Sequence, residues 1–138
     1  MPDENLVGHW SEREVYPHDP EYSDLVFRAD GTGWTYWCSW GQEFSVERFR
    51  WRESAGGILE VKREWALSGT WSLLDGVARH EVEDRDPLAT SLTAAYRITG
   101  DPPTLELDRP LDANLGGTRF LLVARKADPA LWHGIGLG

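Results

Sequence analysis

Apolar and polar residues alternate with a period of two along most of this chain, and turns rich in glycine and aspartate interrupt the alternation at short intervals. Successive side chains of a strand point to opposite faces, so this period predicts half-buried strands rather than helices. In the segment 24–28, Leu25 and Phe27 share one face, and the turn at 29–33 joins this segment to a second run at 34–40. The predicted fold class is therefore all-β and antiparallel.

Further strand-like runs follow along the whole chain. They span residues 43–52, 58–67, 70–74, 77–83, 92–98, 105–107 and 118–126. In the first of these the apolar positions change phase after Val46, which predicts a bulge or a bend near Glu47 and Arg48. The last run is apolar on both faces, so we expect it to be covered on both sides or closed into a barrel. Sequential hairpins of this kind predict one antiparallel up-and-down barrel of 8–10 strands over residues 1–138, because closure removes exposed edges.

Composition narrows the class of protein. A chain of 138 residues with 41% hydrophobic and 27% charged residues is sufficient for one globular domain. The net charge of −9 repels phosphate backbones and argues against nucleic acid as a partner. The apolar runs of the chain are too short to cross a bilayer, and its acidic start lacks a secretion signal. We therefore expect a cytoplasmic protein without membrane contact. Cys38 is the one cysteine, which excludes an internal disulfide and a cysteine-based zinc site.

Eight tryptophans are the most informative part of the composition. Each indole can bury roughly 200 Å² and brings one N–H that needs an acceptor, so these side chains indicate a core, an interface or a binding site. In the run 34–40, Trp34, Tyr36 and Trp40 share one face with Cys38, while Trp37 lies on the other. We expect the more aromatic face to point into the barrel.

The predicted function is binding of a small hydrophobic or amphipathic molecule inside the barrel, without catalysis. A barrel of this size is either filled by side chains or holds one small ligand, and the sequence leaves both open. Arg63, on an otherwise apolar face, needs an anion, supplied by the ligand or by an internal carboxylate. His80 is either a satisfied core residue or a ligand contact. With Tyr36 and Tyr96, these two would orient the polar end of the ligand. The full candidate set is Trp34, Tyr36, Trp40, Phe44, Arg63, Trp65, His80 and Tyr96.

Other chemistry has little support in the sequence. No catalytic motif is present, and His18 and His133 lack metal-ligand spacing, so we expect no cofactor and no metal. The alternative function is an acidic protein-binding module of the inhibitor or immunity type, in which an exposed patch of Trp37, Trp51 and Trp132 meets a basic protein. A homodimer through the same patch stays open, and Trp71 is not assigned.

The segment Asn5–Trp10 resembles the Gly-x-Trp opening of lipocalins and of the wider calycin group, and Leu25–Gly33 resembles the second hairpin of bacterial lipocalin-like domains. The resemblance implies that Trp10, after Gly8, plugs the closed end of the barrel beneath a basic residue of the last strand. Antiparallel pairing of the first and last strands makes Arg125 that residue.

The chain also departs from known calycins. It lacks the signal peptide and the disulfide of secreted lipocalins, and the second glycine-rich extension of nitrobindin-like haem barrels. Extracellular transport and haem binding therefore do not carry over. Fatty-acid-binding calycins pair an internal arginine with the ligand carboxylate, which is the role that the resemblance offers Arg63.

Overall fold

The computed structural model describes residues 4–12, 21–75, 77–111 and 118–126. Nine strands form in these ranges. They are β1 (Gly8–Ser11), β2 (Glu21–Phe27), β3 (Thr32–Ser39), β4 (Glu43–Ala55), β5 (Ile58–Leu74), β6 (Val77–Pro87), β7 (Ser91–Thr99), β8 (Thr104–Leu107) and β9 (Arg119–Ala124). No helix among the described residues is long and apolar enough to span a membrane.

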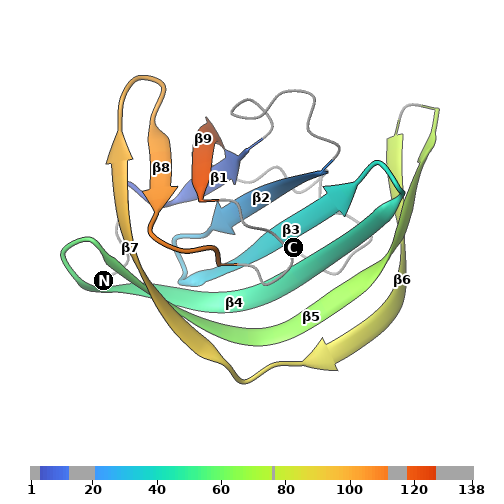
Figure 1. Cartoon of the computed structure of the whole chain (residues 1–138), viewed down its shortest axis with the longest axis horizontal. Coiled ribbons are helices and arrows are strands. Elements are labelled where there is room, and N and C mark those ends of the chain that lie inside the picture. The colour runs from blue at the N-terminus through green and yellow to red at the C-terminus, as the bar shows by residue number, and fades with distance from the viewer. Residues whose placement is uncertain (1–3, 13–20, 76, 112–117, 127–138) are drawn as a thin grey trace.

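All nine strands belong to one antiparallel sheet, and eight of them form a closed, barrel-like ring. The strand order is β4-β3-β2-β1-β9-β8-β7-β5-β6, and a further pairing of β4 with β5 closes the ring. The predicted antiparallel all-β architecture is confirmed. Figure 1 shows β6 outside the ring, continuing the sheet beyond β5.

Strand β5 is the branch point of this sheet, because one of its edges pairs with two strands in turn. Residues 58–62 pair with β7 and residues 65–74 pair with β6. The prediction of separate strands at 58–67 and 70–74 is wrong. The chain runs through Gly69 without a turn because glycine lets β6 approach: a Cβ there would lie 1.9 Å from the carbonyl oxygen of Glu81.

A register shift between β4 and β5 falls where the sequence predicts an irregularity. Arg48 pairs with Trp65, and Phe49 pairs with Arg63, so Glu64 is the extra residue. The predicted place is confirmed, but the extra residue lies on β5 rather than on β4. Strand β4 alternates regularly; its apolar side chains simply move from one face to the other along its length.

Two apolar clusters lie on opposite faces of the sheet. We call the cluster inside the ring the interior cluster. It comprises Leu6, Trp10, Leu25, Phe27, Phe49, Trp51, Leu59, Val61, Ala94, Leu105, Leu107, Leu111 and Phe120. The outer cluster comprises Val26, Trp34, Tyr36, Cys38, Phe44, Val46 and Leu67, with Trp65 and Trp71 packed against it. Leu25 and Val26 are neighbours in β2 and belong to different clusters, so the clusters occupy different faces.

The face of strand β3 that points into the ring is therefore the opposite of the predicted one. Its alternation is as expected, but Trp34 and Tyr36 face away from the interior, whereas Thr35 pairs with Leu25 on the inner face. The inner face is decided by the neighbour, β2, whose Leu25 and Phe27 pack in the ring. Gly33 is required opposite Phe27, because a Cβ there would lie 2.6 Å from the Phe49 ring.

The last strand is less buried than expected. Phe120 is buried in the interior cluster, but Val123 is 55% exposed. Of the two expected arrangements, coverage of both faces is not observed, whereas closure of the strand into a barrel-like ring is. Ring closure satisfies the backbone of β9 through β1 and β8, so its outer face can remain in water.

Candidate functional site

Trp10 lies among the side chains of the interior cluster. Trp10 is fully buried, and its indole nitrogen donates to the carbonyl oxygen of Leu6 at 2.9 Å. The guanidinium of Arg125 lies 6.0 Å from the centre of the Trp10 ring and donates to Asn5 and Val7 carbonyl oxygens. This is the placement that antiparallel closure predicts for Arg125. Trp10 is therefore held both by packing in the interior cluster and by these polar contacts.

Gly8 allows the first and last strands to approach closely beside Trp10. Its φ is +153°, and a Cβ would lie 2.8 Å from the carbonyl oxygen of Ala124. Any larger residue would push β9 away from β1. The glycine therefore serves strand pairing directly.

Four of the predicted ligand residues lie outside the ring interior, in or against the outer cluster. Trp34, Tyr36 and Phe44 belong to the outer cluster, and Trp65 packs against it. Trp40 stands at the end of β3 and is 69% exposed. The prediction that these five line the interior is wrong, because it chose the inner face by aromatic content instead of by strand register.

Tyr36 and His80 are brought together, but on the outer side of the sheet. The Tyr36 hydroxyl lies 2.7 Å from His80 Nε2, and the His80 ring packs edge-on against Phe44 at 4.8 Å between ring centres. Burial lowers the pKa of His80 below its ordinary value. A neutral imidazole then accepts a hydrogen bond from the Tyr36 hydroxyl, so the pair ties β6 to β3.

Arg63 faces the interior and finds its anion within the protein. Its Nε donates to Glu47 at 2.8 Å, and a terminal nitrogen donates to the carbonyl oxygen of Leu111 at 2.6 Å. The two charged side chains are 14% and 12% exposed. Of the two sequence readings, the internal ion pair is the one observed, so Arg63 is not free to bind a ligand carboxylate.

Tyr96 is engaged elsewhere. It packs at the margin of the interior cluster, and its hydroxyl donates to Glu53 at 2.5 Å. Arg63, His80, Tyr36 and Tyr96 thus fall into three separate contacts and do not converge on one ligand end.

A polar stretch of the inner face, of which the sequence analysis singled out only Arg63 as an inward residue, lies on β2, β3, β4 and β5. Register places Ser23 beside Trp37, Trp37 beside Ser45, and Thr35 beside Glu47. We call Ser23, Thr35, Trp37, Ser45, Glu47 and Arg63 the polar inner site. The sequence did contain a signal for this site, because Thr35 and Trp37 alternate with Trp34 and Tyr36 and so form the opposite, less aromatic face of β3.

Three atoms of the polar inner site are buried without a hydrogen-bond partner among the described residues. They are Ser23 Oγ, Thr35 Oγ1 and Trp37 Nε1. Ser23 is 3% exposed and Thr35 is fully buried. Nearby, the Glu12 carboxylate accepts from the Ser23 backbone nitrogen at 2.6 Å. Hydrogen-bonding capacity is therefore concentrated here and partly unused.

Sequence reasoning also missed a buried histidine–carboxylate pair. His9 Nε2 lies 3.0 Å from Asp24 Oδ2, and both side chains are 5% exposed. Ser11 pairs with Asp24 in register. This composition is that of nucleophilic catalysis, but the near-complete burial encloses the pair and favours a role in joining β1 to β2.

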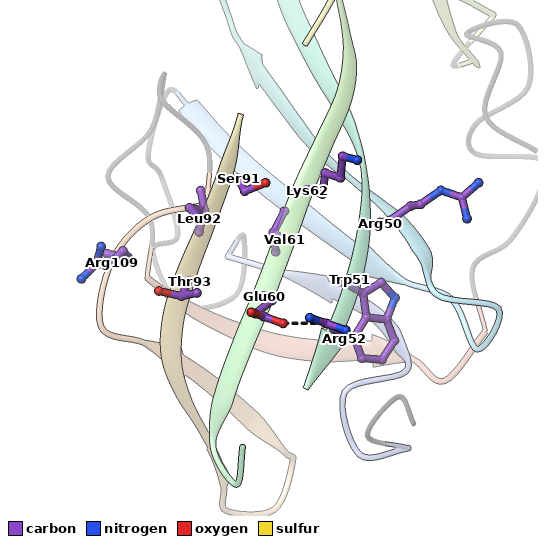
Figure 2. Close-up of a pocket in the computed structure, with 10 residues that line it drawn as sticks. All are labelled: Arg50, Trp51, Arg52, Glu60, Val61, Lys62, Ser91, Leu92, Thr93 and Arg109. Carbon is purple, nitrogen blue, oxygen red and sulfur yellow. Dashed lines mark hydrogen bonds and ion pairs between the residues drawn. The ribbon is translucent and has the colours of Figure 1, made fainter. Parts of the chain in front are cut away.

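An open groove of about 620 Å³ lies across β4, β5 and β7. Figure 2 shows its side chains, with Arg52 and Glu60 turned toward one another. The polar residues that line it are Arg50, Arg52, Glu60, Lys62, Ser91, Thr93 and Arg109. All but the partly buried Glu60 are exposed, so the groove is a feature of the outer surface.

No family model, curated protein or solved structure matches this chain. The calycin resemblance therefore stays a prediction from sequence. Within the described part of the chain, no group of three or more histidine, cysteine or acidic side chains is placed to hold a metal. His18, His133 and Trp132 lie outside the described residues.

Proposed function

We propose that the protein binds a small amphipathic molecule inside the ring, with its polar end at the polar inner site and its apolar part against the interior cluster. The observation that carries this proposal is the set of three buried, unpartnered atoms on Ser23, Thr35 and Trp37. A buried polar atom without a partner costs about 1–3 kcal/mol. A ligand or an ordered water that satisfies these atoms removes this cost.

The polar groups also restrict the head group of the ligand. An indole N–H only donates, whereas the two hydroxyls both donate and accept. Glu47 already compensates the charge of Arg63, and Glu12 adds a second buried carboxylate. A neutral, hydroxyl-bearing head group therefore suits this site better than a carboxylate. Within the predicted class of amphipathic molecules, this favours an alcohol or polyol over a fatty acid.

Thr35→Val gives a test with two opposite readouts. Valine has nearly the same shape, so losing an unpartnered hydroxyl should raise the stability of the empty protein by about 1 kcal/mol. The same change should weaken binding of a medium-chain alcohol, measured by tryptophan fluorescence and native mass spectrometry. Thr99→Val on the exposed end of β7 is the matched control and should change neither quantity.

A second test compares two probes, the medium-chain alcohol and a fatty acid of equal chain length. The alcohol should bind more tightly than the fatty acid. If neither probe binds, and protein purified from its own host retains no small molecule, the proposal is wrong. A loss of stability in Thr35→Val would show that the hydroxyl has a protein partner.

A protein-binding role remains the second candidate, on a different surface from the one that the sequence suggested. Trp51 is 4% exposed and Trp37 faces the polar inner site, so these two cannot anchor a partner. Trp40 and Leu73 are instead 69% and 64% exposed. Trp40 directly follows Ser39, whose carbonyl oxygen accepts from the Trp71 indole nitrogen, and Leu73 lies two residues beyond Trp71 on the same strand.

The free edge of β6 adds the charge that such a partner would meet. No other described strand pairs with this edge, and it carries Glu81, Glu83, Asp84 and Asp86, all exposed. Like charges oppose pairing with a second copy, so the surface fits a basic segment. Trp40→Ser should abolish capture of such a partner while leaving alcohol binding unchanged, and unchanged capture would exclude this surface.

A further inference from the structure

The outer groove carries a charge opposite to that of the whole protein. The chain has a net charge of −9, yet Arg50, Arg52, Lys62 and Arg109 line the groove with one carboxylate, Glu60. We propose that this groove binds the oxyanion of a small organic phosphate or carboxylate, with Lys62 as the central contact. The groove residues alternate with the interior cluster along each strand, so this site is separate from the polar inner site.

Among the groove cations, Lys62 is the one for which the described residues provide no ion pair, since Arg109 lies 3.7 Å from Asp108. Arg50 forms an ion pair with Glu64 at 3.2 Å, and Arg52 forms one with Glu60 at 2.5 Å. No described residue forms an ion pair with Lys62. Its direct cross-strand neighbour on β4 is Arg50, another cation.

Two like charges directly opposite each other in a sheet are unfavourable. An anion placed between Lys62 and Arg50 would reverse this interaction. The bound oxyanion would accept hydrogen bonds from both charged side chains, and such charge-assisted bonds are about twice as strong as neutral ones.

The opposite neighbour of Lys62 completes the recognition. Ser91 of β7 pairs with Lys62 in register, and both line the groove. Its hydroxyl can donate to the same oxyanion that Lys62 contacts. Thr93 repeats this arrangement beside Glu60, one step along β7.

The size of the groove indicates more than an inorganic ion. A volume of about 620 Å³ lies in the range of small-molecule sites, which hold an organic body in addition to a charged group. A phosphate ester or a polycarboxylate therefore fits better than free phosphate.

Binding of inorganic phosphate, phenyl phosphate and citrate to the full chain can be measured by calorimetry at low ionic strength. We expect saturable binding, tighter for an organic probe than for inorganic phosphate. Preference for phenyl phosphate would assign the ester class, and preference for citrate would assign the carboxylate class. Because the groove charges are exposed, added salt should weaken either complex.

Variants localise the site. Lys62→Gln should weaken the best probe about tenfold, the effect of losing one charge-assisted contact. Arg97→Gln removes an exposed positive charge from β7 outside the groove and should leave the affinity unchanged. Equal losses in both variants, or no saturable binding of any probe at millimolar concentration, would overturn the proposal. Because Lys62 is exposed, Lys62→Gln should leave the fold unchanged, and circular dichroism of the variant checks this.

Discussion

The ion pair of Arg63 with Glu47 is the strongest test of the reassigned interior. Both side chains are nearly buried, and the Arg63–Glu47 distance is 2.8 Å. Removing one partner of such a pair costs about 3–5 kcal/mol, because the remaining charge stays buried without compensation. Arg63→Met also removes the donor to the Leu111 carbonyl oxygen, so we expect the upper part of this range.

A double-mutant cycle separates the ion pair from the packing of each side chain. Glu47→Gln also leaves a buried charge, but the amide keeps an acceptor for Arg63, so it should cost the lower part of the same range, about 3 kcal/mol. The double variant should be more stable than the sum of the single effects predicts, by about 2 kcal/mol. Urea denaturation followed by tryptophan fluorescence gives all four free energies of unfolding.

The exposed pair of Arg97 with Glu106 is the matched control. Their side chains are 71% and 29% exposed, and exposed pairs contribute at most about 1 kcal/mol. If Arg63→Met costs less than this, and the coupling with Glu47 does not exceed the coupling in the control, Arg63 is not satisfied by the protein. Its role as a ligand contact would then have to be restored.

Three further changes test other parts of the fold by the same denaturation assay. Trp10→Ala should cost about 3–5 kcal/mol, since it empties a fully buried site, and a loss below 1 kcal/mol would contradict the plug. Gly33→Ala should cost about 3 kcal/mol or more, since its Cβ would lie 2.2 Å from the Val26 carbonyl oxygen; a neutral result would refute the register of β2 and β3. Burial lowers the pKa of His80 in the folded state. The contribution of His80 to the free energy of unfolding should therefore be fully present above about pH 6.5, the pKa of histidine in the unfolded chain, and should decrease as the pH falls below that value. His80→Gln should reduce this acid dependence, and an unchanged pH profile would exclude His80 as its source.

Strand identity and hairpin order could be predicted because they depend on local signals. The turn before Gly33 contains Gly31 with φ of +86°, and the Asp30 carboxylate accepts from the Thr32 backbone nitrogen at 2.9 Å. Hydrogen bonds from the Thr32 hydroxyl and the Thr32 backbone nitrogen, with one from Arg28, hold the pKa of Asp30 well below its usual range. Such a turn fixes which residues of β2 and β3 pair, whatever lies beyond them.

The direction of each face could not be predicted, because it depends on contacts between strands that are distant in sequence. Whether Trp34 points inward depends on where Leu25 and Phe27 pack, and their neighbours include Leu105 and Phe120. Aromatic content suggested the wrong face, because it assumed a single apolar core. This sheet has two, and the larger side chains of β3 serve the second.

The existence of the outer cluster changes what the tryptophans mean for function. A ring whose interior already contains Trp10 and Trp51 does not need Trp34 or Trp65 inside it to be stable. The inner face of β3 can therefore carry Thr35 and Trp37, whose polar atoms have no hydrogen-bond partner among the described residues. Packing of the outer cluster stabilises the sheet and so offsets the cost of polar atoms without partners on the inner face. For this reason Thr35→Val should raise the free energy of unfolding and weaken ligand binding at the same time.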